Sequence, residues 1–215
     1  MRELNYKITK DISFTLNYNY NYNYKIYNMK NIIYFYLFIA IIVSFLIIYY
    51  LYNIMTQTPI CAIAVFTDDK IKGYVKFTEI FKTNNIAIEL NIVGLKNNSL
   101  HGFHVHEAGD LTDKCTSMCA HFNPYNKKHG CPGAKERHVG DLGNIQTNNK
   151  GEAKYTFYDD VIKLRGTKAN IIGRGLIIHA DEDDCGNGGN AESLKTGNAG
   201  KRIACAVIGY SKENF

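Results

Sequence analysis

The stretch Ile86-Ala87-Ile88-Glu89-Leu90-Asn91-Ile92 carries the clearest structural pattern in the chain. Its four large aliphatic side chains stand two residues apart, so on a strand they share one face, while Glu89 and Asn91 face water. Two further pairs repeat the alternation more weakly: Val75 with Phe77, and Tyr155 with Phe157. Alternation of this kind is typical of half-buried antiparallel strands.

Turn sequences and two long polar tracts interrupt these strands. Lys96-Asn97-Asn98-Ser99 and Asn148-Asn149-Lys150-Gly151 are turn sequences of the kind that separate strands in a sandwich or barrel. Residues 107–137 and 180–201 are rich in glycine and polar side chains and exceed the usual length of a connecting loop. Loops that long are normally functional or disordered. We therefore expect an all-β domain over residues 60–215 with two long functional loops.

Length and charge narrow the classes of protein further. A chain of 215 residues has room for one ordinary domain and an extension. Its formal net charge is +5, with 21% charged and 46% hydrophobic residues, which excludes a highly charged disordered chain. Most of the basic excess lies in residues 1–59, so the region that follows is close to neutral. No nucleic-acid partner is expected.

The N-terminal region differs from the rest. Residues 1–31 contain the low-complexity repeat Asn17 to Tyr24, in which asparagine and tyrosine alternate with no aliphatic face, and we expect no regular structure there. Residues 32–55 carry no charge, and as a helix they would be about 36 Å long, against a hydrocarbon core of about 30 Å. The sequence predicts a transmembrane signal-anchor helix over 32–55 and a linker over 56–59.

Flanking charges predict how this helix is oriented. Lys25 and Lys30 precede the apolar run, and Lys70 is the first basic residue after it. The positive-inside rule then places the N-terminus in the cytoplasm and the β domain on the luminal or extracellular side. The alternative is a signal peptide whose cleavage releases a secreted protein. It is less favoured, because the apolar run exceeds about 15 residues and Thr56-Gln57-Thr58-Pro59 is a poor cleavage site.

All seven histidines fall between positions 101 and 179. His104 and His106 are two apart, so on a strand both imidazoles lie on one face, and they would supply half of a metal site. An isolated His-x-His is weak support for one. His101 has the parity of Phe103 and Val105, and we expect it to face inward as a buried histidine.

A second group of potential ligands follows in the first long loop. His121, His129, His138 and Asp141 together offer three imidazoles and a carboxylate, a set that suits tetrahedral zinc. Four protein ligands leave no open position, so such a site would be structural. His179 ends an apolar run over 171–178 and would project from a strand end, without a partner evident from the residues around it.

Four motifs, taken together, resemble the copper/zinc superoxide dismutases: Gly102-Phe103-His104-Val105-His106-Glu107, His121-Phe122-Asn123-Pro124, Arg137-His138-Val139-Gly140-Asp141-Leu142-Gly143-Asn144 and Gly197-Asn198-Ala199-Gly200-Lys201-Arg202-Ile203-Ala204-Cys205. The resemblance runs from about residue 60 to 210. It implies an eight-stranded Greek-key β-barrel, an immunoglobulin-like sandwich, that usually forms a homodimer and builds its metal site from two long loops.

The resemblance also implies the ligands and the reaction. Copper would be held by His104, His106, His121 and His179, and zinc by His121, His129, His138 and Asp141. His121 would bridge both metals, and Asp183 would orient ligands of each. The reaction would be disproportionation of superoxide to dioxygen and hydrogen peroxide, with copper cycling between Cu(II) and Cu(I) and His121 also acting as a proton donor.

Three charged residues match positions that guide the anion. Arg202 would sit at the channel mouth as a permanent cation, and Lys195 with Glu192 would form the charged pair of the second long loop. The chain departs from the family pattern at Asp181-Glu182-Asp183-Asp184, which is more acidic than in many relatives. We therefore expect weaker electrostatic steering here.

The six cysteines follow the same reasoning. By resemblance, Cys115 and Cys205 form the family's intrasubunit disulfide. We hypothesise a second bridge between Cys131 and Cys185, because the loops that carry them meet over the metals in this family and the predicted compartment is oxidising. Cys61 is expected to be a buried thiol. Cys119 is either free or competes for Cys205 by thiol exchange.

Three functional hypotheses compete at this point. The domain is an enzyme, a copper-delivery or metal-buffering module on the same fold, or a metal-free structural relative. Copper-delivery relatives typically lack some ligands or carry a separate thiol-rich domain, whereas this chain has every ligand position, Arg202 and the disulfide pair. These features favour the enzyme.

Overall fold

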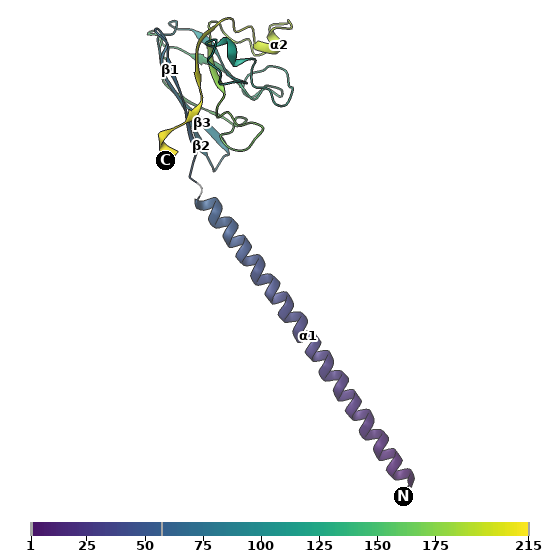
Figure 1. Ribbon diagram of the computed structural model, residues 1–215. Helices are drawn as coiled ribbons and strands as arrows, with labels where there is room; N and C mark the ends of the chain where they lie inside the picture. The colour runs from purple at the N-terminus through teal and green to yellow at the C-terminus, as the bar shows by residue number, and fades with distance from the viewer. Residues whose placement is uncertain (1, 57, 215) are drawn as a thin grey trace. The chain divides into compact units, whose positions relative to one another are not determined.

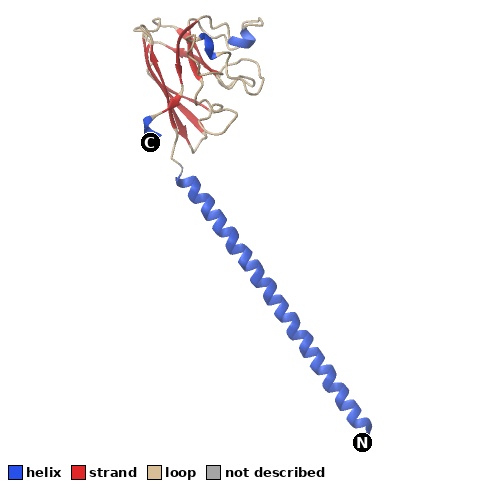
Figure 2. Cartoon of the chain, in the orientation of Figure 1, coloured by secondary structure: helices blue, strands red, loops and turns tan. Residues whose placement is uncertain are grey.

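The computed structural model describes residues 2–56 and 58–214, with side chains described for residues 25–52 and 58–214. The chain divides into two compact units, residues 1–57 and residues 58–215. The first unit is the helix α1 (Arg2–Thr56), and the second holds all the strands of the described residues (Figures 1 and 2).

Helix α1 is longer than the helix predicted over residues 32–55. It extends through the Asn-Tyr repeat, for which we expected no regular structure. Extending an existing helix costs far less than nucleating a new one, so the apolar segment accounts for continuation into residues that lack a helical pattern. Within α1, Lys25–Tyr52 is long and apolar enough to cross a membrane, judged by length and composition alone.

Two antiparallel sheets form the second unit (Figure 2). One has the order β6-β3-β2-β1-β9, with β6 (Thr156–Asp159), β3 (Asn85–Val93), β2 (Lys72–Ile80), β1 (Cys61–Thr67) and β9 (Gly209–Tyr210). The other has the order β5-β4-β7-β8, with β5 (Asp141–Gln146), β4 (Leu100–His106), β7 (Gly175–His179) and β8 (Arg202–Val207). Strand β9 follows β8 after a single residue and joins the opposite sheet. The nine strands therefore correspond to the eight segments expected.

The core lies between the sheets and is built by the alternation seen in the sequence. In β3, Ile86, Ile88, Leu90 and Ile92 are buried, while Glu89 is exposed. Strand β2 pairs with β3 along its full length, which places Phe77 opposite Ile88 and Val75 opposite Leu90. Burial of the four aliphatic side chains of β3 confirms the inward face predicted for this strand.

The weaker pair, Tyr155 and Phe157, fits the predicted alternation only in part. Phe157 packs against the core, but Tyr155 precedes β6 and is 39% exposed. Its hydroxyl accepts a hydrogen bond from the Gln146 backbone N–H at 2.9 Å. A polar tip with a partner at the sheet edge keeps this ring at the surface.

The two long loops are as irregular as predicted, apart from the short helices η1 (Thr116–Met118) and α2 (Ser193–Thr196). Two disulfides fasten them. Cys115–Cys205 ties the first loop to β8, and Cys131–Cys185 ties the two loops to each other, as hypothesised. The chain closes with η2 (Lys212–Asn214), where Ser211 donates a backbone hydrogen bond to the carbonyl of Cys61. The two disulfides fix the loops beside the sheet that carries His104, His106 and His179.

Candidate metal centre

Strand pairing brings three of the predicted copper ligands together. His104 and His106 lie on β4, and the neighbouring strand β7 ends at His179. An antiparallel bridge between His106 and His121 adds the fourth ring from the first long loop. The four side chains each offer one ligand atom within 4.8 Å of the others, and none is more than 4% exposed: His104, His106, His121 and His179.

Each of these four rings has one nitrogen without a protein partner. The unpartnered atoms are His104 Nδ1, His106 Nε2, His121 Nε2 and His179 Nε2. The opposite nitrogens are held by Asp183 Oδ2 (2.7 Å), the Cys119 carbonyl (3.0 Å), Asp141 Oδ1 (3.0 Å) and the Gly200 carbonyl (3.1 Å), in the same order. Buried ring nitrogens rarely lack a partner, so four in one cluster fit a metal ion. Four imidazoles suit copper.

A second cluster surrounds Asp141, which is fully buried. The Nδ1 atoms of His121 and His138 lie 3.0 and 3.1 Å from its Oδ1, and His129 Nδ1 lies 3.0 Å from its Oδ2. The last contact lacks hydrogen-bond geometry. Backbone N–H groups of His138 and Gly130 donate to Oδ2 at 2.8 and 3.1 Å. Three imidazole nitrogens converging on a fixed carboxylate fit tetrahedral zinc.

His121 is the only histidine that belongs to both of these clusters. Its Nε2 points into the first cluster and its Nδ1 contacts the carboxylate of the second. The two nitrogens of an imidazole lie on opposite sides of the ring, so this one side chain contacts both clusters.

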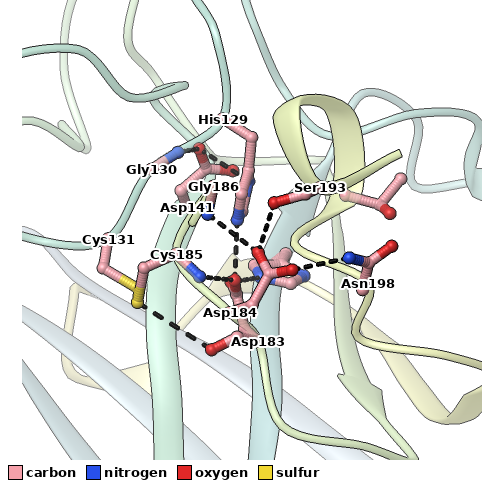
Figure 3. Close-up of polar contacts among 12 residues, drawn as sticks. His129, Gly130, Cys131, Asp141, Asp183, Asp184, Cys185, Gly186, Ser193 and Asn198 are labelled. Carbon is pink, nitrogen blue, oxygen red and sulfur yellow. Dashed lines mark hydrogen bonds and ion pairs between the residues drawn. A yellow bond between two sulfur atoms is a disulfide. The ribbon is translucent and has the colours of Figure 1, made fainter. Parts of the chain in front are cut away.

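Asp183 contacts one histidine of each cluster, His104 and His129. It is 1% exposed, and its oxygens lie 2.7 Å from His104 Nε2 and 2.8 Å from His129 Nε2. The Cys185 N–H donates to it at 2.7 Å (Figure 3). Asn144 fixes its backbone: the Asn144 amide donates to the Asp183 carbonyl at 2.9 Å, and the Asp183 N–H donates back at 2.8 Å. Sequence reasoning gave Asn144 no role, since the two residues are 39 positions apart.

The acidic run 181–184 is not a free negative surface. Asp183 is buried, and Asp184 accepts hydrogen bonds from Ser193 Oγ at 2.7 Å and from the Asn198 amide at 2.6 Å (Figure 3). Half of the run therefore organises the second long loop. This weakens the sequence-based reason to expect poor steering.

A pocket opens above the unpartnered nitrogens. Its wall includes the metal-cluster rings His106, His121, His138 and His179 and the charged side chains Glu192, Lys195 and Arg202. Arg202 is anchored by hydrogen bonds to the carbonyls of Cys115 (2.6 Å) and Cys119. Cys119 has φ +64°, a region that favours glycine. Nothing in the sequence pattern marks its carbonyl, which holds both Arg202 and His106.

The remaining histidine and free thiols match their expectations. His101 is buried, and its Nδ1 donates to the His179 carbonyl at 2.8 Å, so it supports the end of β7. Cys61 is a buried free thiol. Cys119 is exposed and free, and Cys205 is bonded to Cys115. Of the two alternatives for Cys119, the structure contains the free thiol.

Burial and neighbouring charges shift the pKa values of the site. Burial lowers the pKa of His104 to about 3 and that of His179 to about 4. Burial also acts to lower the pKa of His129, but its contacts with Asp141 and Asp183 outweigh this and raise it to about 9. Both carboxyl groups are buried, and their histidine partners nevertheless hold each pKa well below the usual range.

These shifts predict how the stability of the metal-free protein depends on pH. His104 and His179 are neutral when folded but take up protons near pH 6.5 when unfolded, so stability falls as the pH drops from about 7 to 4. The free energy of unfolding should fall by a few kcal/mol over this range, because each pKa unit corresponds to about 1.4 kcal/mol. The stabilisation from His129 is complete below about pH 6.5 and is lost as the pH rises through 9. Urea unfolding of the metal-free protein at pH 5, 7 and 9 checks this: equal stability at pH 5 and 7 contradicts it.

The family assignment comes from comparison with known proteins. A sequence model of the family described as copper/zinc superoxide dismutase (SODC) matches residues 71–208. The chain belongs to this family. A Cu-Zn superoxide dismutase of Paramecium bursaria Chlorella virus 1 is 64% identical over 157 residues, which cover 73% of this chain and 82% of the relative.

Other relatives agree. The extracellular Cu-Zn superoxide dismutase of Drosophila melanogaster is 51% identical over 140 residues, covering 65% of this chain and 76% of that protein. The crystal structure of the clock protein EA4 superposes with a TM-score of 0.68 at 42% identity, covering 72% of this chain and 97% of that one. The β unit is therefore a copper/zinc superoxide dismutase, an oxidoreductase that converts superoxide to dioxygen and hydrogen peroxide with copper and zinc as cofactors. Of the three hypotheses, the enzyme is confirmed.

Proposed function

We propose that the two clusters divide the metals between them. In this assignment His104, His106, His121 and His179 hold copper, and His121, His129, His138 and Asp141 hold zinc. The observation that carries the proposal is the pair of nitrogens on His121, one unpartnered among three other unpartnered ring nitrogens and one against the Asp141 carboxylate. Copper supplies the one-electron chemistry of the reaction when it is bound.

The proposed role of His121 in proton transfer follows from its two nitrogens. Its Nε2 faces the pocket and would be open to a proton whenever no metal is bound to it, while its Nδ1 is held against the Asp141 carboxylate. The ring therefore keeps its orientation while the proton moves at Nε2. A held ring can deliver that proton to the reduced substrate, as general acid catalysis requires.

We propose that residues 60–215 work as the catalytic domain, and the direct test uses the purified chain. Superoxide decay is followed before and after loading with copper and zinc, and metal content is measured in the same samples. We expect dismutation that requires copper and is greatest with both metals. Loading without any gain in the rate of decay contradicts the proposal.

Arg202 is proposed to guide superoxide into the pocket, with Lys195 and Glu192 shaping the field around it. The guanidinium donates to the carbonyls of Cys115, Thr116 and Cys119, and it keeps its charge at any working pH. Arg202→Ala is expected to lower kcat/KM by about 10- to 100-fold at low ionic strength, within the range seen for electrostatic steering. Arg202→Lys should retain more of the rate, because it keeps the charge.

Ionic strength separates steering from a structural effect of the same substitution. Salt screens exposed charges, so the rate of the parent should fall as salt rises, and the rate of Arg202→Ala should depend on salt less steeply. Rates measured from about 10 mM to 200 mM salt test this. Equal salt dependence in parent and variant would show that Arg202 does not guide the anion.

We propose that residues 32–55 anchor the chain in a membrane as a signal-anchor helix, after the polar segment 1–31 and before the linker 56–59. The support is the apolar span Lys25–Tyr52. The two disulfides of the β unit fit a luminal or extracellular location. Membrane fractionation with protease protection tests this: an anchored domain pellets with membranes and is protected inside sealed vesicles. A soluble, shortened product would favour the secreted alternative.

A homodimer is proposed on the family resemblance alone. Sedimentation velocity of residues 58–215 is the direct test, since that unit contains its own core. A mass of two chains supports the proposal, and a single-chain mass across the micromolar range contradicts it.

A further inference from the structure

The Cys131–Cys185 disulfide lies beside the metal centre, outside both ligand sets. Cys131 is two residues after His129 in the first long loop, and Cys185 is two residues after Asp183 in the second. The sulfurs join positions 54 residues apart. Both half-cystines are partly buried, and the close-up in Figure 3 places them next to Asp183.

Backbone groups next to each half-cystine bind the carboxylates of the site. The N–H of Gly130 donates to Asp141 Oδ2 at 3.1 Å, and the N–H of Cys185 donates to Asp183 Oδ1 at 2.7 Å (Figure 3). Both carboxylates meet the same ring: His129 Nδ1 lies 3.0 Å from Asp141 Oδ2, and His129 Nε2 lies 2.8 Å from Asp183 Oδ1. The disulfide thus closes a ring of contacts around His129.

Keeping Asp141 and Asp183 against His129 costs free energy unless a covalent bond holds the two loops together. Two buried carboxylates lie on one histidine, and buried charged groups are stable only when their partners stay in place. Cys185 has φ +59°, which a non-glycine residue adopts only when its surroundings impose it. Other links between the loops are few: His129 donates its backbone N–H to the Leu194 carbonyl at 3.0 Å. Among the described residues the disulfide is the one covalent bond between the loops, and unlike the His129–Asp183 contact it does not depend on a protonation state.

We propose that the Cys131–Cys185 disulfide holds His129, Asp141 and Asp183 in their metal-binding arrangement before zinc enters, so that zinc binds a preformed site and leaves it slowly. Cys131 and Cys185 are positioning residues, since they act through His129 and Asp183. The inference rests on the zinc assignment proposed above. Holding ligands in place beforehand raises affinity by removing the cost of ordering them on binding.

The test compares zinc release from the parent and from the Cys131→Ser/Cys185→Ser double variant. Both proteins are loaded with zinc and mixed with excess chelator, and release is followed over time. We expect release about 10- to 100-fold faster from the double variant, the range typical when groups that orient metal ligands are lost. Cobalt(II), which gives a visible spectrum at tetrahedral sites, should bind the variant more weakly by a similar factor.

Substitution is preferable to chemical reduction for two reasons. A reductant would also open Cys115–Cys205. Reduced thiols at 131 and 185 would, with Asp183, offer three ligand atoms within 4.8 Å and could capture metal themselves. Serine removes the bond without adding soft ligands. A Cys131→Ala/Cys185→Ala variant, which adds no hydroxyl, provides a second measurement if the serine variant folds poorly.

Amide hydrogen exchange of the metal-free proteins reports the loop arrangement directly. The N–H of Gly130, bonded to Asp141, and the N–H of Gly186, bonded to Asp184 at 2.9 Å, should exchange at least about 10-fold faster in the double variant. Amides of β2 and β3 should not change. The matched control is Cys61→Ser, a change of the same type in β1 and outside the metal clusters.

The outcomes separate this inference from the proposed function. Fast zinc release and fast exchange at Gly130 in the double variant support the proposed role of the Cys131–Cys185 disulfide. Release and exchange equal to those of Cys61→Ser overturn it. Neither readout uses superoxide. A loaded parent protein that releases zinc slowly but does not dismutate superoxide would contradict the proposed function. It would not contradict the proposed role of the Cys131–Cys185 disulfide.

Discussion

Replacing His121 with alanine is expected to reduce superoxide dismutation by more than about 100-fold and to weaken binding of both metals. The loss should exceed the 10- to 100-fold typical of groups that only orient ligands, because His121 contributes a nitrogen to each cluster. Superoxide decay and metal content after dialysis are the measurements. A variant that keeps both metals and the parent rate contradicts the shared role.

His138→Ala is the matched control for this prediction. His138 belongs to the Asp141 cluster alone, and its ring lies 5.7 Å from that of His121 between centroids. We expect this variant to lose zinc and to keep copper. If His138→Ala and His121→Ala lose both metals equally, the two clusters do not act as separate sites.

The second large effect is expected from the Cys115–Cys205 disulfide. Removing a bond across 90 residues costs about 4 to 5 kcal/mol of folding free energy in the chain-entropy model. Cys131–Cys185 lies inside that span and already shortens the unfolded loop, so we expect about 4 kcal/mol for Cys115→Ser/Cys205→Ser. Denaturant unfolding of the metal-free parent and variant at one pH measures this.

The same variant tests the anchoring of Arg202. Its guanidinium donates to the carbonyl of Cys115, so a loosened loop should also lower the rate of the loaded enzyme at low salt. Cys61→Ser controls for a cysteine-to-serine substitution elsewhere in the domain.

The stability prediction has its own limit. If Cys115→Ser/Cys205→Ser lowers the free energy of unfolding by less than about 1 kcal/mol, the predicted stabilisation by this disulfide is contradicted, since an ordinary point substitution costs as much.

The sequence predicted most of what local pattern encodes. The alternation at residues 86–92 identified a strand and its buried face correctly, and the parity of His104 and His106 placed both rings on one side of β4. The link from these rings to His121 and His179 required the family resemblance. Nothing local joins residues that meet only after β4 pairs with β7 and the first loop folds back.

What the sequence could not predict are contacts set by tertiary folding. The Asn144–Asp183 pair spans 39 residues, and the Cys119 carbonyl is a backbone group with no signature in residue type. The acidity of the run 181–184 led us to expect weaker steering, but the Asp184 carboxylate accepts hydrogen bonds from Ser193 and Asn198. The extent of α1 was also underestimated, because a low-complexity repeat shows no helical pattern even where a neighbouring helix extends into it.

The central claim is that one imidazole is shared by two different metal ions. Anomalous diffraction from crystals of the loaded protein, collected at the copper and zinc edges, tests it most directly. We predict a copper peak among the unpartnered nitrogens of His104, His106, His121 and His179, and a separate zinc peak beside Asp141, about 2.0 Å from His121 Nδ1. Both metals on the same side of the His121 ring, or a single peak at both edges, would contradict the account.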